Sequence, residues 1–422
     1  MAPSAVKQPS TVSTFEAKGA PIIDRTKTTA VNMEGLKYPE YYPHNEPGDK
    51  FPDAEPFEYH DRALDADPTM PVFYNDHVQI EEVGYGQWSI ESSTVSFFLV
   101  NLTPFIGVKV TGLDLATLDE AGQDQLALLA AKKGIVFFAS DDKVKQTFRD
   151  ISQKRKLEMV RYYGQLHKNS VQPRTHDSTE ISVVYQDNIN TVRVRSSPNK
   201  PNKQFSNCPL VNYVAKILQK HWWPNRLSRA VWHIDQSQEH QPPGMTFFCC
   251  MQADAPTGGD TLVGSLVEAY ERLSPPMKQF LCGLRAVHSS KVMSAKAARV
   301  GGALRKNDIE SSHPVVYEQP ATGLKSIYIN PERISHFEGL RHEESEWLLR
   351  FLSDYLTKSA DFHARYKWSE GDVCVWDQRV CLHSAVLDNM DYRRHFIRIT
   401  ALAGIPKQAT YTPPTYEDKY AY

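Results

Sequence analysis

The stretch 394–400 constrains the fold more than any other part of this 422-residue sequence. In an extended strand, residues two apart leave the same face, so Arg394 and Arg398 would project together, about 13 Å apart. Ile397 and Ile399 occupy the opposite face, which is apolar and suited to packing. Unless the two arginines are an ordinary surface pair, they need anions, because an unpaired buried charge is very costly. The fold must then pack one face of this strand and hold negatively charged groups at the other.

The order of the elements indicates an α+β fold. The first half contains helical patterns, with apolar side chains at helical spacing over 143–163 and a capping box at 117–120. The second half contains short apolar strands, such as 245–252 and 327–330, separated by glycine turns, and a loop is expected over 289–308. Helices early and short strands late predict an α+β chain built on an all-β, barrel-like core.

Composition along the chain predicts four parts. Residues 1–35 are polar and lack periodicity, which is typical of a flexible N-terminal tail. Residues 36–78 are rich in Pro and Tyr and are predicted to form an arm packed on the core, because aromatic side chains favour burial and prolines prevent long elements. Residues 79–410 form the predicted main domain, and 411–422 a C-terminal tail.

Charge and hydropathy narrow the classes of partner. The net charge of −2 and the pI near 6.7 provide no basic field for nucleic acid or an anionic membrane. No run reaches the roughly 18 apolar residues of a membrane span, and the first residues lack a secretory pattern. We therefore expect a cytoplasmic protein that binds a small molecule, with no nucleic acid or membrane partner; whether it forms a homo-oligomer is left open.

The segment 231–235 places His233 and Asp235 two residues apart. If it is extended, both side chains point to one place, as two ligands of one metal must. The pair alone is weak evidence, because fifteen histidines produce such spacings by accident. His383 is the best third ligand, since it follows an apolar strand and a polar turn and precedes the cationic strand. Two imidazoles and a carboxylate on one face suit a mononuclear iron(II) with open positions.

Seven motifs then occur in an order that is known from one family. They are WHID (232–235), PPG (242–244), TGGDT (257–261), AYERLS (269–274), HPVV (313–316), VWDQR (375–379) followed by His383, and RR (393–394) followed by Arg398. In this arrangement the chain resembles the taurine dioxygenase family of Fe(II)/2-oxoglutarate-dependent oxygenases from about residue 100 to 403. Its lead segment is similar to that of fungal members described as sulfonate dioxygenases.

The resemblance implies a double-stranded β-helix, or jelly roll, with flanking helices and with Fe(II) bound by His233, Asp235 and His383. It also implies that Thr261 and Arg394 hold the distal carboxylate of 2-oxoglutarate, and that O2 is the other cosubstrate. A planar guanidinium can hold a carboxylate by two charge-assisted hydrogen bonds. The reaction implied is oxidation of a substrate C–H bond with release of succinate and CO2.

The same resemblance points to residues that would contact the substrate. Arg398 corresponds to the arginine that meets the anionic end of the substrate, and His167 is a substrate contact, a core histidine or an oligomer contact. Asn169 stands where sulfonate-binding members usually have histidine, and asparagine can donate a hydrogen bond but carries no charge. The prediction is therefore a small anionic organic substrate, either an alkylsulfonate or an amino acid or other carboxylate of specialised metabolism.

Two other classes of function remain at this point. A zinc-dependent hydrolase would use the same three ligands to hold a metal and a water, but it would leave Arg394, Arg398 and Thr261 without a role. A non-catalytic jelly roll that binds a small anion is the other alternative. Succinate formation that depends on iron and 2-oxoglutarate would distinguish the oxygenase from both.

Overall fold

The computed structural model describes residues 35–46, 48–68, 78–82, 88–92, 96–141, 144–186, 231–299, 302–389 and 392–413. The predicted tails therefore lie outside the described residues, apart from residues 35 and 411–413. Among the described residues, no helix has the length and apolar character needed to cross a membrane.

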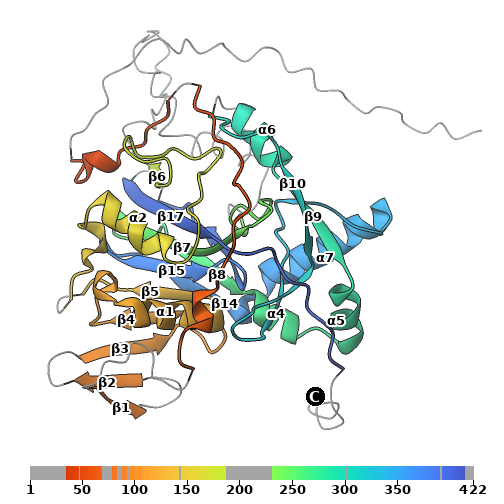
Figure 1. Ribbon diagram of the computed structural model, residues 1–422, viewed down its shortest axis with the longest axis horizontal. Helices are drawn as coiled ribbons and strands as arrows, with labels where there is room; N and C mark the ends of the chain where they lie inside the picture. The colour runs from red at the N-terminus through yellow and green to blue at the C-terminus, as the bar shows by residue number, and fades with distance from the viewer. Residues whose placement is uncertain are drawn as a thin grey trace, which may run out of the picture.

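A nine-stranded sheet runs through the molecule (Figure 1). Its neighbours pair in antiparallel fashion except for β4 and β5, which are parallel. In spatial order its strands are β1 (Val78–Glu82), β2 (Trp88–Ser92), β3 (Ser96–Asn101), β4 (Val108–Thr111), β5 (Ile135–Phe138), β15 (Val373–Asp377), β7 (Pro243–Ala253), β17 (Arg394–Leu402) and β6 (Ser182–Gln186).

A smaller sheet packs on one face of the large one and completes the jelly-roll core. It contains β14 (His363–Tyr366), β8 (Thr261–Ser265) and β16 (Cys381–Ala385), in that order. Apolar side chains from both sheets share one buried cluster, in which the rings of Phe248 and Phe396 stack with centroids 4.6 Å apart. The predicted α+β chain with an all-β core is confirmed, and the core is a two-sheet sandwich.

Alternation along β17 assigns its two faces, as predicted. Ile397 and Ile399 belong to the cluster beneath the helices, whereas Phe396 belongs to the cluster between the sheets. Because Arg394 and Arg398 share parity with Phe396, they lie on the inner face of the sandwich, and both are buried.

Helices α1 (Glu120–Lys133) and α2 (Gln153–Arg161) cover the outer face of the large sheet, with α1 beside β5 and α2 beside β17 (Figure 1). The predicted cap of α1 is wrong by two residues: 115–117 forms a short 3-10 helix, and α1 is capped by Asp119, whose side chain accepts from Gly122 N–H at 2.8 Å. The single helix predicted over 143–163 is also wrong, because a separate 3-10 turn (Thr147–Arg149) precedes α2 and Ser152 caps α2.

The remaining elements surround the small sheet, where α4 and α7 pack in a second large cluster with Leu382 of β16. They are α4 (Leu266–Glu271), α5 (Pro275–Cys282), β9 (Arg285–Ser289), α6 (Lys291–Arg299), β10 (Glu310–Pro314), β11 (Val316–Glu318), β12 (Lys325–Ile327), β13 (Ile334–Phe337) and α7 (His342–Lys358). The loop predicted over 289–308 is wrong because α6 lies within it, and the strand predicted over 327–330 ends at Ile327, since Asn330 starts a turn.

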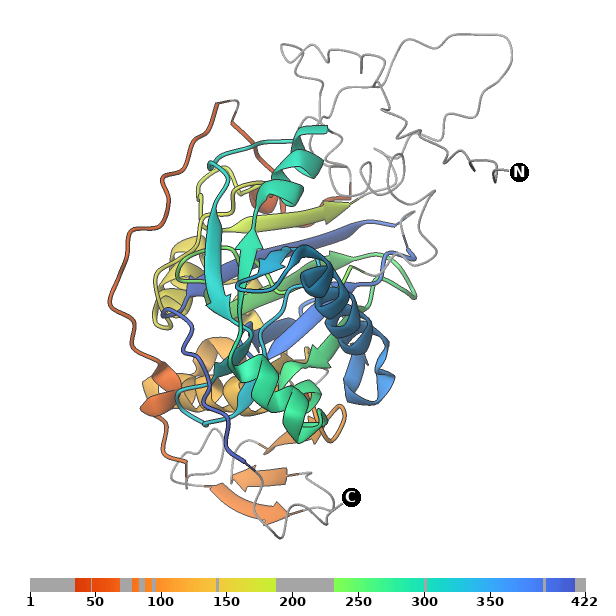
Figure 2. The same cartoon turned by 90° about the vertical axis from the view of Figure 1, so that its right-hand side faces the viewer.

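The predicted arm is described over 35–46 and 48–68, and Figure 2 shows it running along one edge of the molecule. Tyr41 is buried in the core beneath the helices, and its hydroxyl accepts from Lys156 Nζ at 2.7 Å. Farther along, Asp61 Oδ2 lies 2.6 Å from Arg379 Nη1, and both side chains are buried. These contacts attach the arm to the core; the exact domain limits stay a prediction.

Candidate metal centre and active site

The structure brings His233, Asp235 and His383 together. His233 and His383 face each other across a short antiparallel bridge, with backbone N···O distances of 2.9 and 3.0 Å. This pairing brings the centroids of their rings to 4.3 Å from each other. Asp235 follows two residues after His233. One ligand atom from each of the three side chains lies within 4.8 Å of the others. His233 and His383, which are 150 positions apart in sequence, thus meet because the segment 231–235 pairs with β16.

Each histidine presents one ring nitrogen to the centre. His233 Nδ1 lies 2.8 Å from the Val231 carbonyl oxygen and donates to it, which leaves Nε2 directed to Asp235 Oδ1 at 3.4 Å. His383 Nε2 lies 3.7 Å from Asp235 Oδ2. Burial, assisted by the charge of His233, lowers the pKa of His383 to about 3, so its imidazole is neutral, as a metal ligand must be.

The Asp235 carboxylate is oriented by two neighbours. Gln378 donates to Oδ2 at 2.9 Å and accepts from the Asp235 backbone N–H at 3.1 Å, while Arg398 Nη1 lies 2.6 Å from Oδ2. Burial acts to raise the pKa of Asp235, but the positive charge of Arg398 holds it well below its usual range. The centre therefore combines two imidazole nitrogens with an ionised carboxylate, and this donor set fits iron(II).

Arg394 lies apart from the triad on the same inner face of the sandwich. Its guanidinium lies 4.2 Å from the centroid of the Phe396 ring, and the residue is 6% exposed. Within the described residues, no acceptor forms a hydrogen bond with this guanidinium. Burial lowers its pKa to about 10. A buried cation without a hydrogen-bonded partner is a ready site for a carboxylate.

Thr261 is linked to Arg394 through two aromatic side chains. The indole N–H of Trp368 donates to Thr261 Oγ1 at 2.9 Å, and the Trp368 ring meets the Phe396 ring edge-on with centroids 5.1 Å apart. Because the threonine hydroxyl accepts from Trp368, its own proton remains available to a ligand. Thr261 and Arg394 are therefore placed around one aromatic cluster, although their proposed role toward 2-oxoglutarate is still a prediction.

His167 lies in a buried charged cluster. Its Nε2 and the Lys306 ammonium both lie 2.9 Å from Glu239 Oε1, and all three side chains are buried. Burial lowers the pKa of His167, so a neutral ring donates to the carboxylate while Lys306 provides the positive charge. This contact matches the core alternative for His167, and a substrate contact by His167 stays a prediction.

Asn169 shapes the chain beside Arg398. Its Oδ1 accepts from the backbone N–H groups of Val171 and Gln172 at 3.0 and 2.8 Å, which closes an Asx turn. The Gln172 amide oxygen in turn accepts from Arg398 Nη2. Asn169 thus acts on Arg398 through Gln172, and direct contact between Asn169 and substrate stays a prediction.

Three supporting residues were not identified from the sequence. Gln378 lies within the VWDQR motif, so a signal for it existed. No sequence motif pointed to a supporting role for Gln172 or Asn330. Asn330 is fully buried, and its Nδ2 donates to the Ile234 carbonyl at 2.5 Å and to Ser237 Oγ at 2.9 Å, which fixes the segment that carries the metal ligands.

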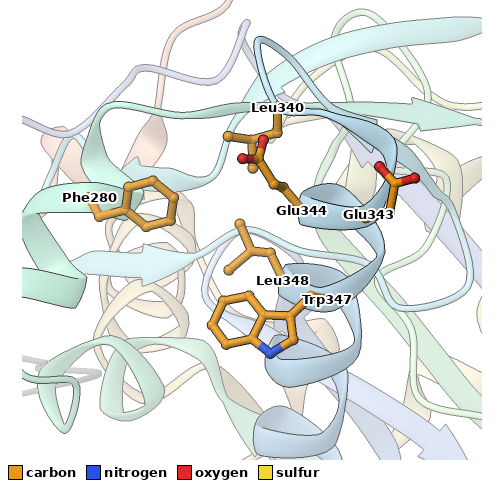
Figure 3. Close-up of a pocket in the computed structure, with 6 residues that line it drawn as sticks. All are labelled: Phe280, Leu340, Glu343, Glu344, Trp347 and Leu348. Carbon is orange, nitrogen blue, oxygen red and sulfur yellow. The ribbon is translucent and has the colours of Figure 1, made fainter.

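An apolar groove lies elsewhere, between α5 and α7 (Figure 3). Its lining consists of Phe280, Leu340, Glu343, Glu344, Trp347 and Leu348. It shares no residue with the metal centre, and its two glutamates lie on an exposed helix end. The groove is therefore not the active-site candidate.

Comparison with known proteins agrees with this geometry. Residues 100–400 match the family described as "Taurine catabolism dioxygenase TauD, TfdA family". The chain is 33% identical over 385 residues to the alpha-ketoglutarate-dependent dioxygenase cnsP of Penicillium expansum, covering 90% of each chain. It is 32% identical over 375 residues to an alpha-ketoglutarate-dependent sulfonate dioxygenase of Saccharomyces cerevisiae, covering 88% of this chain and 79% of the relative.

The fold is also similar to that of a solved taurine dioxygenase from Burkholderia xenovorans. The TM-score is 0.53 at 23% identity, over 75% of this chain and 94% of that structure. The family match and the two relatives, both named as dioxygenases, set aside the hydrolase and the non-catalytic alternatives. The chain therefore belongs to the TauD/TfdA family and is an α-ketoglutarate-dependent dioxygenase that uses Fe(II) and 2-oxoglutarate.

Proposed function

We propose that this protein oxidises a C–H bond of a small organic anion while it converts 2-oxoglutarate and O2 into succinate and CO2. One observation supports the proposal above all others. Two buried arginines, Arg394 and Arg398, lie on the inner face of β17, and Arg398 contacts the metal-ligand residue Asp235. Two anions, the cosubstrate and the substrate, would each have a cation close to the site of reaction.

Each proposed role follows from the chemistry of the residue. Iron(II), when held by His233, Asp235 and His383, supplies the positions at which 2-oxoglutarate and oxygen react. Arg394 would bind the distal carboxylate of 2-oxoglutarate by its fork of N–H groups, and the free proton of the Thr261 hydroxyl would add a third hydrogen bond.

The apolar cluster between the sheets would keep water from the bound cosubstrate. Phe248, Trp368, Trp376 and Phe396 pack there and are at most 9% exposed. Excluding water strengthens each charge-assisted hydrogen bond in the pocket and limits unproductive reactions. The protein's own contribution is thus to bind, orient and shield the reacting groups while the metal performs the oxidation.

The substrate class rests on Arg398 and on Asn169. Arg398 suits either a sulfonate or a carboxylate. Similarity to the yeast protein named as a sulfonate dioxygenase supports a sulfonate. Asn169, which stands in place of the histidine of sulfonate-binding members, supports amino acids or other carboxylates equally well. We therefore propose an anionic substrate of either kind.

The test is succinate release by the wild type, His383→Ala and the control His60→Ala, across a panel of sulfonates, amino acids and other carboxylates. His60 is exposed and pairs with Asp65, far in sequence from the triad. Wild type and His60→Ala should release succinate only with Fe(II), 2-oxoglutarate and O2, and faster with the correct substrate. His383→Ala should release none; release at the wild-type rate would contradict the proposal.

A further inference from the structure

We infer that Arg333 is a second cation for the anionic head group of the substrate, and that it acts beside Arg398. This inference rests on the proposed function. It assigns to the substrate pocket a residue that lies outside all seven sequence motifs, in the turn between β12 and β13. Four observations about this turn and its charges support it.

The turn is attached to the segment that carries the metal ligands. Asn330, at its start, donates to the Ile234 carbonyl and to Ser237 Oγ. The Arg333 backbone N–H donates to the Asn330 carbonyl at 2.9 Å, and the Arg333 carbonyl accepts from Ser289 N–H at 2.8 Å. The backbone of Arg333 is therefore held firmly beside the residues on either side of Asp235.

The Arg333 residue is half-buried, but one nitrogen of its guanidinium, Nη1, is buried and has no acceptor in the described part of the chain. The adjacent acid is paired with a different cation: Glu332 Oε2 accepts from Lys296 Nζ at 2.9 Å. A buried donor on a charged group without an acceptor is costly, and an anionic ligand would remove that cost.

The charges that act on Arg333 agree with the position of its turn beside the 234–237 segment. Burial lowers the pKa of Arg333 to about 10, and the charges that act on it are those of Asp235, Glu332, Arg398 and Glu239, in decreasing order. Asp235 is a metal-ligand residue, and Arg398 is its ion-pair partner. The charges of both arginines thus act on one carboxylate, and Arg398 is hydrogen-bonded to it.

The donors of Arg398 are already partly occupied. Its Nη1 contacts Asp235, and its Nη2 donates to the Gln172 side chain. A sulfonate has three acceptor oxygens and a carboxylate has two, so Arg398 alone leaves some of them unpaired. Arg333 would supply the missing donors and also the positive charge that Asn169 does not carry. The second cation of the pocket would then come from a different element of the fold.

The experiment compares Arg333→Gln and Arg333→Lys with the control Arg285→Gln. Arg285 lies on the neighbouring β9 and donates to Ser312. Calorimetry would measure binding of hexanesulfonate and of hexanoate to anaerobic protein loaded with Fe(II) and 2-oxoglutarate. Arg333→Gln should bind the probe about 10- to 100-fold more weakly, as expected for loss of a charge-assisted hydrogen bond. Arg333→Lys should lose less, and Arg285→Gln should match the wild type.

A second readout separates substrate binding from a structural role. Since Arg333→Gln removes an unpaired buried charge, the ligand-free variant should melt at the same temperature as the wild type or higher, but the rise in Tm caused by the probe should shrink. A lower ligand-free Tm with unchanged probe affinity would show that Arg333 is structural and would overturn the inference.

The two probes also distinguish the substrate classes. Their results show whether a failure counts against this inference or against the proposed function. A loss confined to hexanesulfonate, or to hexanoate, supports the inference and identifies the head group. Unchanged affinity of Arg333→Gln for both probes overturns it, as does a wild type that binds neither probe yet binds Fe(II) and 2-oxoglutarate. A wild type that fails to bind Fe(II) and 2-oxoglutarate counts instead against the proposed function.

Discussion

Arg398 Nη1 lies 2.6 Å from Asp235 Oδ2, so the arginine proposed to bind the substrate directly contacts a carboxylate of the metal triad. Both side chains are buried, with 8% and 6% of their surface exposed. A substrate anion that binds Arg398 would compete with Asp235 for the same guanidinium. The ion pair therefore couples the occupancy of the substrate site to the orientation of a metal ligand.

Replacing Arg398 should weaken metal binding. Arg398→Met removes the partner that orients Asp235 and keeps it ionised, so we expect Fe(II) to bind about 10-fold more weakly, with a larger loss at acidic pH. An anaerobic titration with Fe(II), monitored by calorimetry, would measure the dissociation constant of the metal. Arg394→Met, which alters no contact of the triad, is the control and should bind Fe(II) like the wild type. Tighter binding of Fe(II) by Arg398→Met would show instead that repulsion between the Arg398 guanidinium and the metal cation outweighs its orienting effect on Asp235.

Replacing Arg394 should act on the cosubstrate alone. Arg394→Met leaves the distal carboxylate without its charged partner, so binding of 2-oxoglutarate should weaken by roughly 2–5 kcal/mol. Arg394→Lys retains the charge but not the two-pronged geometry, and we expect an intermediate loss. The dissociation constant of 2-oxoglutarate in the anaerobic Fe(II) protein is the quantity to measure. An unchanged constant in Arg394→Met would refute the assignment.

Asn169 should contribute to stability through its turn. Asn169→Ala removes the acceptor for two backbone N–H groups, so the free energy of unfolding should fall by about 1–2 kcal/mol. Asn169→Asp keeps an acceptor oxygen at that position and should recover most of the loss. Urea unfolding of the three proteins would measure the effect. Equal stability of Asn169→Ala and wild type would mean that the turn contributes nothing.

The Glu239 cluster should make stability depend on acidic pH. Burial acts to raise the pKa of Glu239, but His167 and Lys306 outweigh it and lower the value from 4.5 to about 2. The unfolded chain therefore binds a proton at higher pH than the folded protein. The ionised Glu239 should therefore stabilise the folded protein by about 3 kcal/mol at most. This stabilisation should be complete above pH 5 and should disappear as the pH falls toward 2.

Urea unfolding of wild type and Glu239→Gln between pH 3 and 7 tests that expectation. The difference in unfolding free energy between the two proteins should shrink as the pH falls. Glu346→Gln, at an exposed position on α7, is the control and should show no such trend. A difference for Glu239→Gln that stays constant across this range would argue against an ionised Glu239 as the source.

Local sequence patterns determined the parts of this protein that depend on neighbours along the chain. Period-two alternation placed Arg394 and Arg398 on one face of β17 and the apolar Ile397 on the other, because side chains of a strand must alternate. The strand expected over 245–252 followed from its apolar character and is observed as β7 (Pro243–Ala253). The ordered motifs indicated the family and its three metal-ligand residues.

Only the tertiary structure decided which distant groups meet. Nothing in the local sequence pairs Arg398 with Asp235, since 163 residues separate them. Nothing marks Asn330 and Arg333 either, because their surroundings arise when the β12–β13 turn docks on the 234–237 segment. The same limit explains the helix misplaced over 143–163, where contacts of Asp114 with Thr147 favour a separate turn. Burial and pairing of charges depend on packing between remote segments, which periodicity does not encode.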